Sequence, residues 1–152
     1  MIDWALTDAL DAEARALAAN PAVKAIVLTS GKKDFVAGAD LAIMHDLYDL
    51  TPEAASDRIG TLGAMVRAFE TSGKPVVGAA PGTALGGGLE ILLGCNYRIA
   101  ADNPKARFGL PEVTLGILPG AGGTQRLPRI IGIPAALPVL VYGKPMTAEQ
   151  AK

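Results

Sequence analysis

The sequence predicts one α/β domain, and three observations carry that prediction. Short apolar runs rich in β-branched residues alternate along the chain with longer segments of helical spacing, which is the order expected of parallel strands joined by helices. Half of the 152 residues are hydrophobic and 19% are charged, which is enough apolar surface for one buried core. Glycine and proline number 18 and 11, so many tight turns should separate the elements.

The first elements should be a helix and a strand. Residues 2–19 carry leucine and alanine at helical spacing and predict a helix. Pro21 ends it, because the residue before a proline disfavours helix. Residues 25–29 (AIVLT) form a short apolar run before a Ser-Gly pair, so we expect a buried parallel strand there.

Two helices and a second strand should follow. Residues 41–47 predict a short helix that Asp40 can cap. Residues 51–53 (TPE) are a helix start, because Thr caps, Pro suits the first helical position and an acid favours the positive end of the helix dipole. An apolar stripe then runs to Phe69. Residues 75–80 (PVVGAA) predict a second buried strand.

The rest of the chain continues this alternation. We expect helices over 89–95, from 123 to 130 and over 135–142, a strand over 97–100, and a pairing segment at 107–109. Thr147 and Gln150 have the spacing of a capping box, which marks the start of a helix. The sequence stops one turn later, so we interpret the chain as part of a longer domain.

Composition excludes several classes of site. The single Cys95 excludes an intrachain disulfide and a cysteine-cluster metal site, and it is expected in the core. The single His45 excludes histidine-rich metal sites and is expected on a helix surface. A net charge of -1, from 14 basic and 15 acidic residues, argues against a nucleic-acid surface.

The sequence offers no membrane span and no leader pattern. No apolar run reaches the ~18 residues that a span needs. The first eleven residues hold three acids and no base, which is unlike a signal or transit peptide. We therefore expect a soluble protein of a reducing compartment, the cytoplasm.

The first candidate for chemistry is the segment 83–90 (TALGGGLE). Three glycines between a strand and a helix let a ligand approach the backbone, and the N–H groups of a helix start suit an oxyanion or a phosphate. Close packing of helix on strand is the alternative explanation. Glu90 is anomalous, because it lies in an apolar stretch where a charge is costly unless it is paired or used.

Glu112 is the second candidate acid. A lone acid after a proline is more often a solvated loop residue, and that alternative stays open. Two acids in apolar settings, each beside a glycine-rich turn, instead suit paired acid and base catalysis, because nearby carboxyls in a pocket have pKa values that are raised and pushed apart.

Two loops and a few basic residues complete the candidates. Residues 35–40 (FVAGAD) can present backbone N–H groups, or can be an ordinary loop. Residues 120–123 (GAGG) can seat an anion or only turn the chain. Lys32, Lys33, Arg126 and Arg129 are expected in solvent, although a phosphate-rich ligand would suit them.

Taken together, three segments resemble the crotonase (enoyl-CoA hydratase/isomerase) family: residues 25–41, 73–101 and 108–132. Each motif alone is weak, but three in this order with both acids are highly specific. Residues 31–40 (GKKDFVAGAD) and 110–129 are most similar to the N-terminal domain of multifunctional β-oxidation enzymes. The resemblance implies a crotonase-like spiral of ββα units and assembly as a homotrimer or hexamer.

The resemblance also implies an acyl-CoA thioester substrate and the residues that act on it. Glu90 and Glu112 match the two catalytic acids. Ala39 and Gly87 match the two residues whose backbone N–H groups form the oxyanion hole, and the other substrate-binding matches are Ala37, Asp40 and Gly86. The reaction implied is hydration of a 2-enoyl-CoA in fatty-acid β-oxidation. No metal or redox cofactor is expected, because coenzyme A is part of the substrate.

The sequence departs from the family at both ends and leaves alternatives open. Residues 1–152 match a partial core domain, without the opening strands and the C-terminal helices of the family. A Δ3-Δ2-enoyl-CoA isomerase, which needs mainly the Glu112 position, is the nearest alternative. An inactive fragment that binds CoA esters is another, and an acyl-CoA hydrolase is disfavoured because no nucleophile beyond the two acids is evident.

Overall fold

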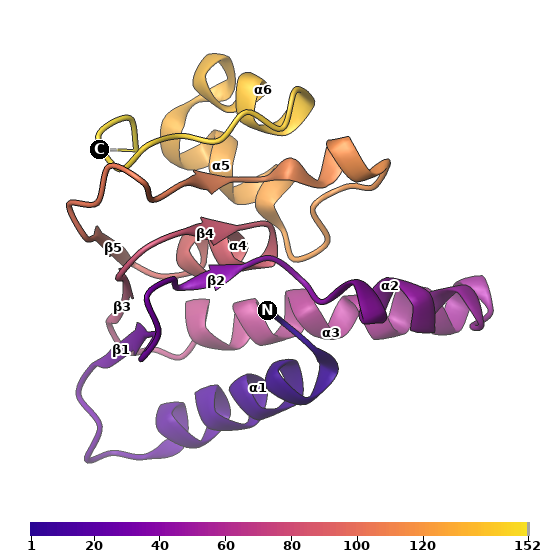
Figure 1. The fold of residues 1–152 in the computed structure, drawn as a ribbon. Coiled ribbons are helices and arrows are strands. Elements are labelled where there is room, and N and C mark those ends of the chain that lie inside the picture. The colour runs from indigo at the N-terminus through magenta and orange to yellow at the C-terminus, as the bar shows by residue number, and fades with distance from the viewer. Residues whose placement is uncertain (152) are drawn as a thin grey trace.

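A computed structural model describes residues 1–151, without the side chains of Leu41 and Met44. Its chain climbs in a spiral that repeats the order strand, strand, helix (Figure 1). Helix α1 (Trp4–Ala19) comes first, and the first turn then holds β1 (Ile26–Thr29), β2 (Val36–Ala37), α2 (Leu41–Tyr48) and α3 (Pro52–Glu70). The second turn holds β3 (Val76–Ala80), β4 (Ala84–Leu85) and α4 (Gly87–Leu93). The third holds β5 (Tyr97–Ala100), β6 (Phe108–Gly109), the 3-10 helix η1 (Pro111–Leu115) and α5 (Gly123–Ile131), and α6 (Ile133–Val141) follows.

The strands of successive turns form two parallel sheets. One sheet has the order β1-β3-β5, and the other has the order β2-β4-β6. In the first, Ile26 pairs with Val76, and Val77 pairs with Tyr97. In the second, Ala37 pairs with Leu85, which pairs in turn with Gly109. Each turn therefore adds one strand to each sheet, and the predicted α/β spiral of ββα units is confirmed.

Local signals set the helix starts as expected. The Asp40 carboxylate accepts the Ala42 N–H at 3.0 Å at the start of α2. The Thr51 hydroxyl accepts the Ala54 N–H at 3.3 Å, and Pro52 is the first residue of α3. These caps satisfy N–H groups that the helix itself leaves free.

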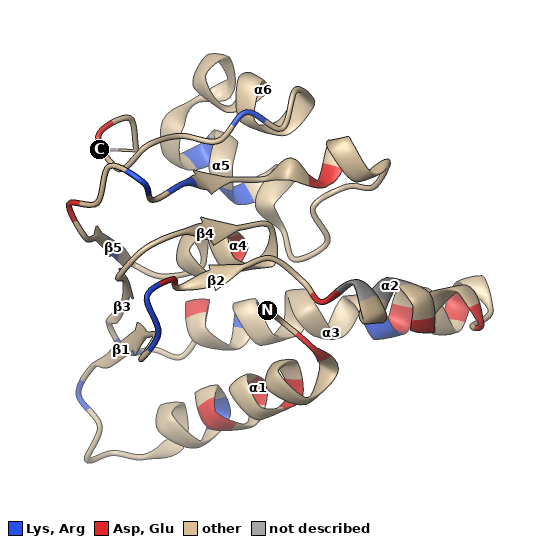
Figure 2. Ribbon diagram, viewed as in Figure 1, with Lys and Arg blue, Asp and Glu red and all other residues tan. Residues whose placement is uncertain are grey.

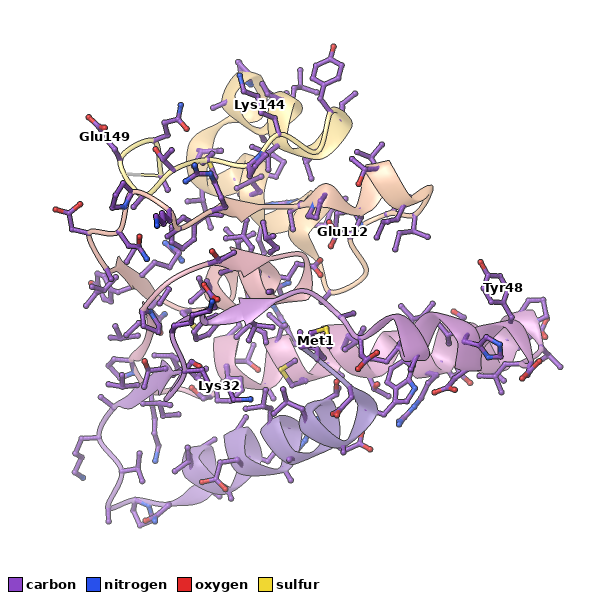
Figure 3. The ribbon with its side chains drawn as sticks, viewed as in Figure 1. Met1, Lys32, Tyr48, Glu112, Lys144 and Glu149 are labelled. Atoms are coloured by element: carbon purple, nitrogen blue, oxygen red, sulfur yellow. The ribbon has the colours of Figure 1, made fainter. Side chains whose placement is uncertain are left out.

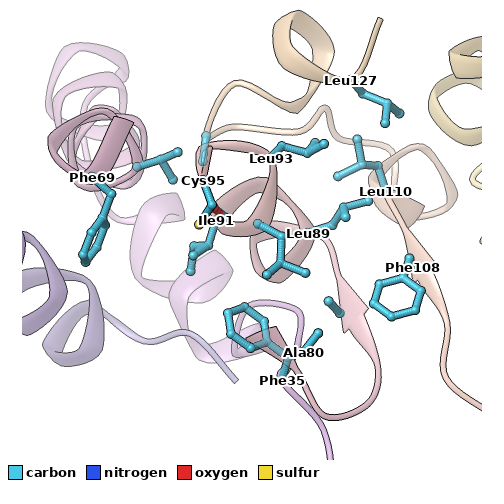
Figure 4. Packing of buried hydrophobic residues seen from close by; sticks show 14 of the residues in the cluster. Phe35, Phe69, Ala80, Leu89, Ile91, Leu93, Cys95, Phe108, Leu110 and Leu127 are labelled. Atoms are coloured by element: carbon cyan, nitrogen blue, oxygen red, sulfur yellow. The ribbon is translucent and has the colours of Figure 1, made fainter. Parts of the chain in front are cut away.

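The core lies inside the spiral, around α4 (Figure 4). Every residue from Gly88 to Cys95 is buried. Met65, Val66 and Phe69 of α3 belong to the same cluster, as do Phe108 and Leu110 after β5. Cys95 is buried as expected, and desolvation raises the pKa of its thiol to about 11. His45 is exposed on α2, as expected.

Three expectations need correction. Strand β1 is not buried throughout: Val27 is 66% exposed, because only one face of the sheet packs on the core. Helix α1 begins at Trp4, since Ile2 instead pairs with Ala39 in an isolated parallel bridge. The two-residue strands β2 and β4 carry no periodicity in the sequence, and they were not expected as strands.

The last described residues form the expected capping box without a helix. The Thr147 N–H donates to Gln150 Oε1 at 3.0 Å, and the Gln150 N–H donates to Thr147 Oγ1 at 3.2 Å. Residues 148–151 form a turn. Within residues 1–151, no helix has the length and apolar character needed to cross a membrane.

Candidate active site

Glu90 lies in the interior because α4 passes through the core. Its residue is 2% exposed, and its neighbours Leu89 and Ile91 are buried with it. Oε1 of Glu90 accepts two backbone N–H groups, from Ala121 at 2.8 Å and from Gly123 at 2.7 Å. The loop before α5 therefore holds this carboxyl at one oxygen. The glycine-rich turn at 120–123 does seat an acidic group, and that group belongs to the protein itself.

The surroundings of Glu90 raise the pKa of its carboxyl to near neutral. Burial is the largest cause, and it raises the pKa of Glu90 to about 7. The negative charge of Glu112 raises it further, while the two N–H groups and the Arg126 guanidinium oppose the shift. A carboxyl with this pKa can accept a proton and return it near pH 7.

Glu112 is also buried, so the solvated-loop alternative is wrong. It lies in η1, where Pro111 occupies the first position, and it is 8% exposed. Its Oε2 is buried without a hydrogen-bond partner among the described residues. Burial raises the pKa of this carboxyl above its ordinary value. Figure 3 shows Glu112 in the segment that follows β6, whereas Glu149 lies at the edge of the view.

The glycine triplet lies against Glu112. A Cβ added at Gly86 would be 3.0 Å from Oε1 of Glu112 and 3.7 Å from the Cα of Gly38. Gly86 has φ 55° and ψ -129°, a conformation that L side chains rarely adopt, and it caps α4. The second acid, the start of α4 and the segment after β2 therefore meet at one place.

Packing also explains part of the triplet. A Cβ at Gly88 would collide with the Val36 carbonyl oxygen, so α4 approaches β2 closely only because this residue is glycine. Gly87 is the first residue of α4, and a helix supplies no acceptor for the N–H groups of its first turn. The packing explanation thus holds for Gly88, and the backbone donor expected at Gly87 stays a prediction.

The second sheet brings together the two segments that lead to Ala39 and Gly87. Ala37 pairs with Leu85 in parallel, and Ala39 and Gly87 each lie two residues farther along. The Ile2 N–H donates to the Gly38 carbonyl at 2.9 Å, and the Asp40 N–H donates to the Ile2 carbonyl at 2.8 Å. Successive backbone groups of an extended segment point in opposite directions, so the Ala39 N–H points away from Ile2.

The other two predicted substrate residues flank this segment. Ala37 ends β2 and is exposed. The Asp40 side chain is engaged in capping α2. A role for Ala37, Asp40 or Gly86 in binding a substrate stays a prediction.

One basic residue departs from its expected setting. The Arg126 side chain is 15% exposed and pairs with Glu70, so the solvated interpretation is wrong. Its neighbour Arg129 is exposed, as expected. The pairing joins α3 to α5 across 56 residues of sequence, and no local pattern signals such a contact.

Two surface clefts lie away from the two buried acids. One open cleft of about 560 Å³ lies between α1, α2 and α3 and includes Trp4 and Arg58. Another, of about 520 Å³, includes Lys74 and Tyr97. Neither is lined by Glu90 or Glu112. In the part of the chain that the structure describes, no three His, Cys, Asp or Glu side chains gather to hold a metal ion.

Comparison with known proteins connects this geometry to a family. The model of the enoyl-CoA hydratase/isomerase family matches residues 2–152. The fatty acid oxidation complex α subunits of Shewanella halifaxensis and Shewanella loihica are 44% and 45% identical to the chain over 134 residues, which are 88% of this chain and 19% of each relative. The predicted similarity to multifunctional β-oxidation enzymes is thereby confirmed.

Solved structures of other proteins are also similar to this chain. An enoyl-CoA hydratase from Bacillus anthracis shares 37% identity with a TM-score of 0.87, and the match covers 99% of this chain and 57% of that one. DspI from Pseudomonas aeruginosa shares 33% identity with a TM-score of 0.89, covering 99% and 56%. The chain spans about a fifth of the curated relatives (19%) and somewhat over half of these solved chains (57% and 56%). It belongs to the enoyl-CoA hydratase/isomerase family, also called the crotonase family.

Proposed function

We propose that this protein hydrates 2-enoyl-CoA thioesters to 3-hydroxyacyl-CoA in fatty-acid β-oxidation. The observation that carries the proposal is one cluster: two buried carboxyls with raised pKa values, Glu90 and Glu112, with the backbone at the start of α4, where Gly86 lies against Glu112 and near Gly38. Hydration needs these two kinds of group, because it moves two protons and places charge on one oxygen.

The thioester carbonyl would lie between the N–H groups of Ala39 and Gly87. As water attacks Cβ, negative charge moves through the double bond to the carbonyl oxygen, and the two donors stabilise it. Removal of one such donor costs on the order of 10²–10³ in rate in other enzymes. Ala37, Asp40 and Gly86 would border the thioester on either side of these donors.

Glu90 and Glu112 would divide the proton transfers. Glu90, ionised, takes one proton from the attacking water as its oxygen bonds to Cβ. Glu112, protonated, gives its proton to Cα as the enolate collapses. Transfer of the proton from Glu90 to Glu112 then restores the starting state. The pKa of about 7 suits Glu90 as the base, and burial suits Glu112 as the acid.

The chemistry requires no metal or redox cofactor, because the thioester itself accepts the developing charge and no electrons leave the substrate. Coenzyme A enters as part of the substrate. We place the reaction in a homotrimer or hexamer in the cytoplasm, with apolar side chains such as Leu118 and Tyr142, 78% and 74% exposed, available for contacts between copies.

Replacement of each acid tests the proposal. Glu90→Gln and Glu112→Gln, made in the intact protein, should each lower kcat for hydration of crotonyl-CoA by about 100-fold or more, because each removes a proton-transfer group. Glu149→Gln is the matched control, since Glu149 is exposed. The assay follows loss of the conjugated thioester absorbance. Full activity in both core variants would overturn the proposal.

An isomerase is the second candidate, and the position of Glu112 beside Gly86 favours it, because isomerisation needs mainly one acid near the oxyanion donors. Rates with a 3-enoyl-CoA and a 2-enoyl-CoA separate the two. Isomerisation of the first without hydration of the second would select the isomerase. Calorimetry with a CoA ester completes the comparison, since binding without turnover of either substrate would indicate a binding protein.

A further inference from the structure

The guanidinium of Arg126 connects α3 to the loop that holds Glu90. Its Nε and Nη2 donate to the two carboxylate oxygens of Glu70 at 3.2 and 2.9 Å. Its Nη1 donates to the Ala121 carbonyl at 2.7 Å. All three nitrogens are therefore engaged, and the fork to Glu70 fixes the orientation of the planar group.

The same loop segment holds Glu90 on its other edge. Ala121 accepts from Arg126 through its carbonyl and donates to Glu90 through its N–H. Gly123 adds the second N–H to the same carboxylate oxygen. Arg126 thus determines where the loop lies, and the loop determines where Oε1 of Glu90 lies.

Gly122 makes this arrangement possible. It has φ 98°, and a Cβ at this position would collide with Nη1 of Arg126. The loop therefore curls around the guanidinium in a conformation that favours glycine. A lysine at position 126 would carry the charge without the planar fork, so it could not bind Glu70 and the Ala121 carbonyl in this geometry.

Glu70 gives the connection a rigid base. It is the last residue of α3, whose residues Met65, Val66 and Phe69 are buried in the core. Arg67 of the same helix also binds Glu70, at 3.0 Å. Figure 2 shows basic residues on α5 and acidic residues distributed over α1 and the α2–α3 end, with one acidic position on the central helix α4.

We propose that Arg126, held by Glu70, is a positioning residue that fixes the loop before α5 so that Ala121 and Gly123 bind one oxygen of Glu90 and leave the other for the reacting water. The kinetic part of this inference rests on the hydratase function proposed above. The geometric part does not require a substrate.

The charged groups around Glu90 determine how its pKa should change when Arg126 is replaced. Glu112 of η1 and Arg126 of α5 are the charged groups that act on it, and Glu70 of α3 lies behind Arg126. Loss of the guanidinium removes a positive charge and loosens two N–H donors, and both changes raise the pKa of Glu90. A purely structural role would lower stability and leave that pKa unchanged.

Titration of the Glu90 carboxyl carbon by ¹³C NMR tests the geometry. The sequence has six glutamates, and Glu90→Gln identifies the signal. Arg126→Gln should clearly raise the pH midpoint of the Glu90 titration. Glu70→Gln should raise this midpoint less, because the Arg126 guanidinium remains. Arg129→Gln is the matched control: it removes the same charge from the same helix, at a side chain whose hydrogen bonds among the described residues go to Gln125.

Kinetics then test positioning. Arg126→Lys should lower kcat for crotonyl-CoA by about 10-fold or more with KM little changed, because misplacement of a catalytic group acts on the reaction step. Equal Glu90 midpoints in Arg126→Gln and Arg129→Gln would overturn the inference. Should Arg126→Gln fail to fold, the Glu90 midpoints of Arg126→Lys and Glu70→Gln are compared with that of Arg129→Gln in the same titration, and equal midpoints would again overturn the inference. A shifted midpoint in a protein without hydratase activity would overturn only the proposed function.

Discussion

Glu90 and Glu112 are both buried carboxyls, yet the chain surrounds them differently. Two backbone N–H groups hold Oε1 of Glu90, whereas Oε2 of Glu112 is buried without a partner among the described residues. Glu90 lies on α4, a helix that passes through the core, and Glu112 lies on the short 3-10 helix η1 at the edge of the core. The comparison teaches that two buried carboxyls of one fold can differ in how many of their hydrogen bonds the protein itself supplies.

The pH dependence of stability should show the largest difference. The pKa of Glu90 rises from an ordinary value of 4.5 to about 7 on folding. The folded state therefore binds the proton more tightly, and the stability that Glu90 contributes is present below pH 4.5 and lost as pH rises to about 7. The loss should be roughly 3 kcal/mol.

Urea unfolding between pH 5 and pH 8 measures this loss. Glu90→Gln should strongly reduce the change of the unfolding free energy with pH, and Glu112→Gln should reduce it less. The pKa of Glu70 is lowered by Arg126, so Glu70 stays charged throughout this range and does not contribute to the slope. An unchanged slope in Glu90→Gln would show that Glu90 does not titrate near neutral pH.

The second largest difference should appear when each acid is replaced by an apolar residue at a fixed, mildly acidic pH and the free energies of unfolding are compared. Near pH 5.5 the Glu90 carboxyl is protonated and still accepts both N–H groups. Glu90→Met leaves those groups without an acceptor, so the free energy of unfolding should fall by about 2 kcal/mol. Glu112→Met removes one oxygen that has no partner among the described residues and a single hydrogen bond from the residue's own backbone, so it should cost less than Glu90→Met, about 1 kcal/mol or less.

Urea midpoints of the two methionine variants give the comparison directly, with Glu149→Met as the exposed control. Equal destabilisation by the two core variants would contradict the difference between a carboxyl held by two N–H groups of a distant loop and a carboxyl with one unpartnered oxygen.

Backbone amides should show the smallest effect, and the most local. As Glu90 ionises, the amide protons of Ala121 and Gly123 should shift downfield with a midpoint near the pKa of about 7, because they donate to its Oε1. The Gly86 amide donates to the Gly109 carbonyl at 2.9 Å, so it should not follow that transition. A pH series of ¹H–¹⁵N spectra measures both. Midpoints near 4.5 for Ala121 and Gly123 would contradict the raised pKa.

The parts of the fold that were predictable from sequence are those governed by neighbours in the chain. The starts of α2 and α3 follow from Asp40 and Thr51, because a cap acts on N–H groups two or three residues away. Burial of Glu90 followed from its apolar neighbours. The family resemblance then drew attention to Glu112, whose burial the structure shows, and to Ala39 and Gly87, whose roles stay predictions.

The strands were harder to predict. Strands β2 and β4 have two residues each, too few for an alternating pattern, and they exist because they pair with each other in parallel register within one sheet. The exposure of Val27 and Tyr97 also escaped prediction. Apolar runs indicate a strand without indicating how many of its faces are covered, and here one face of the sheet points outward.

The sequence by itself determined which acids the protein possesses, which turns can take unusual backbone angles and where most helices begin, because caps, glycines and apolar stripes act over a few residues. Only the tertiary structure decided what those acids meet. The donors to Glu90 lie 31 and 33 residues away, and Arg126 and Glu70 are 56 residues apart. Such contacts arise when a spiral stacks one turn on another, and it is this stacking that surrounds a carboxyl with amides and gives it a pKa near neutral.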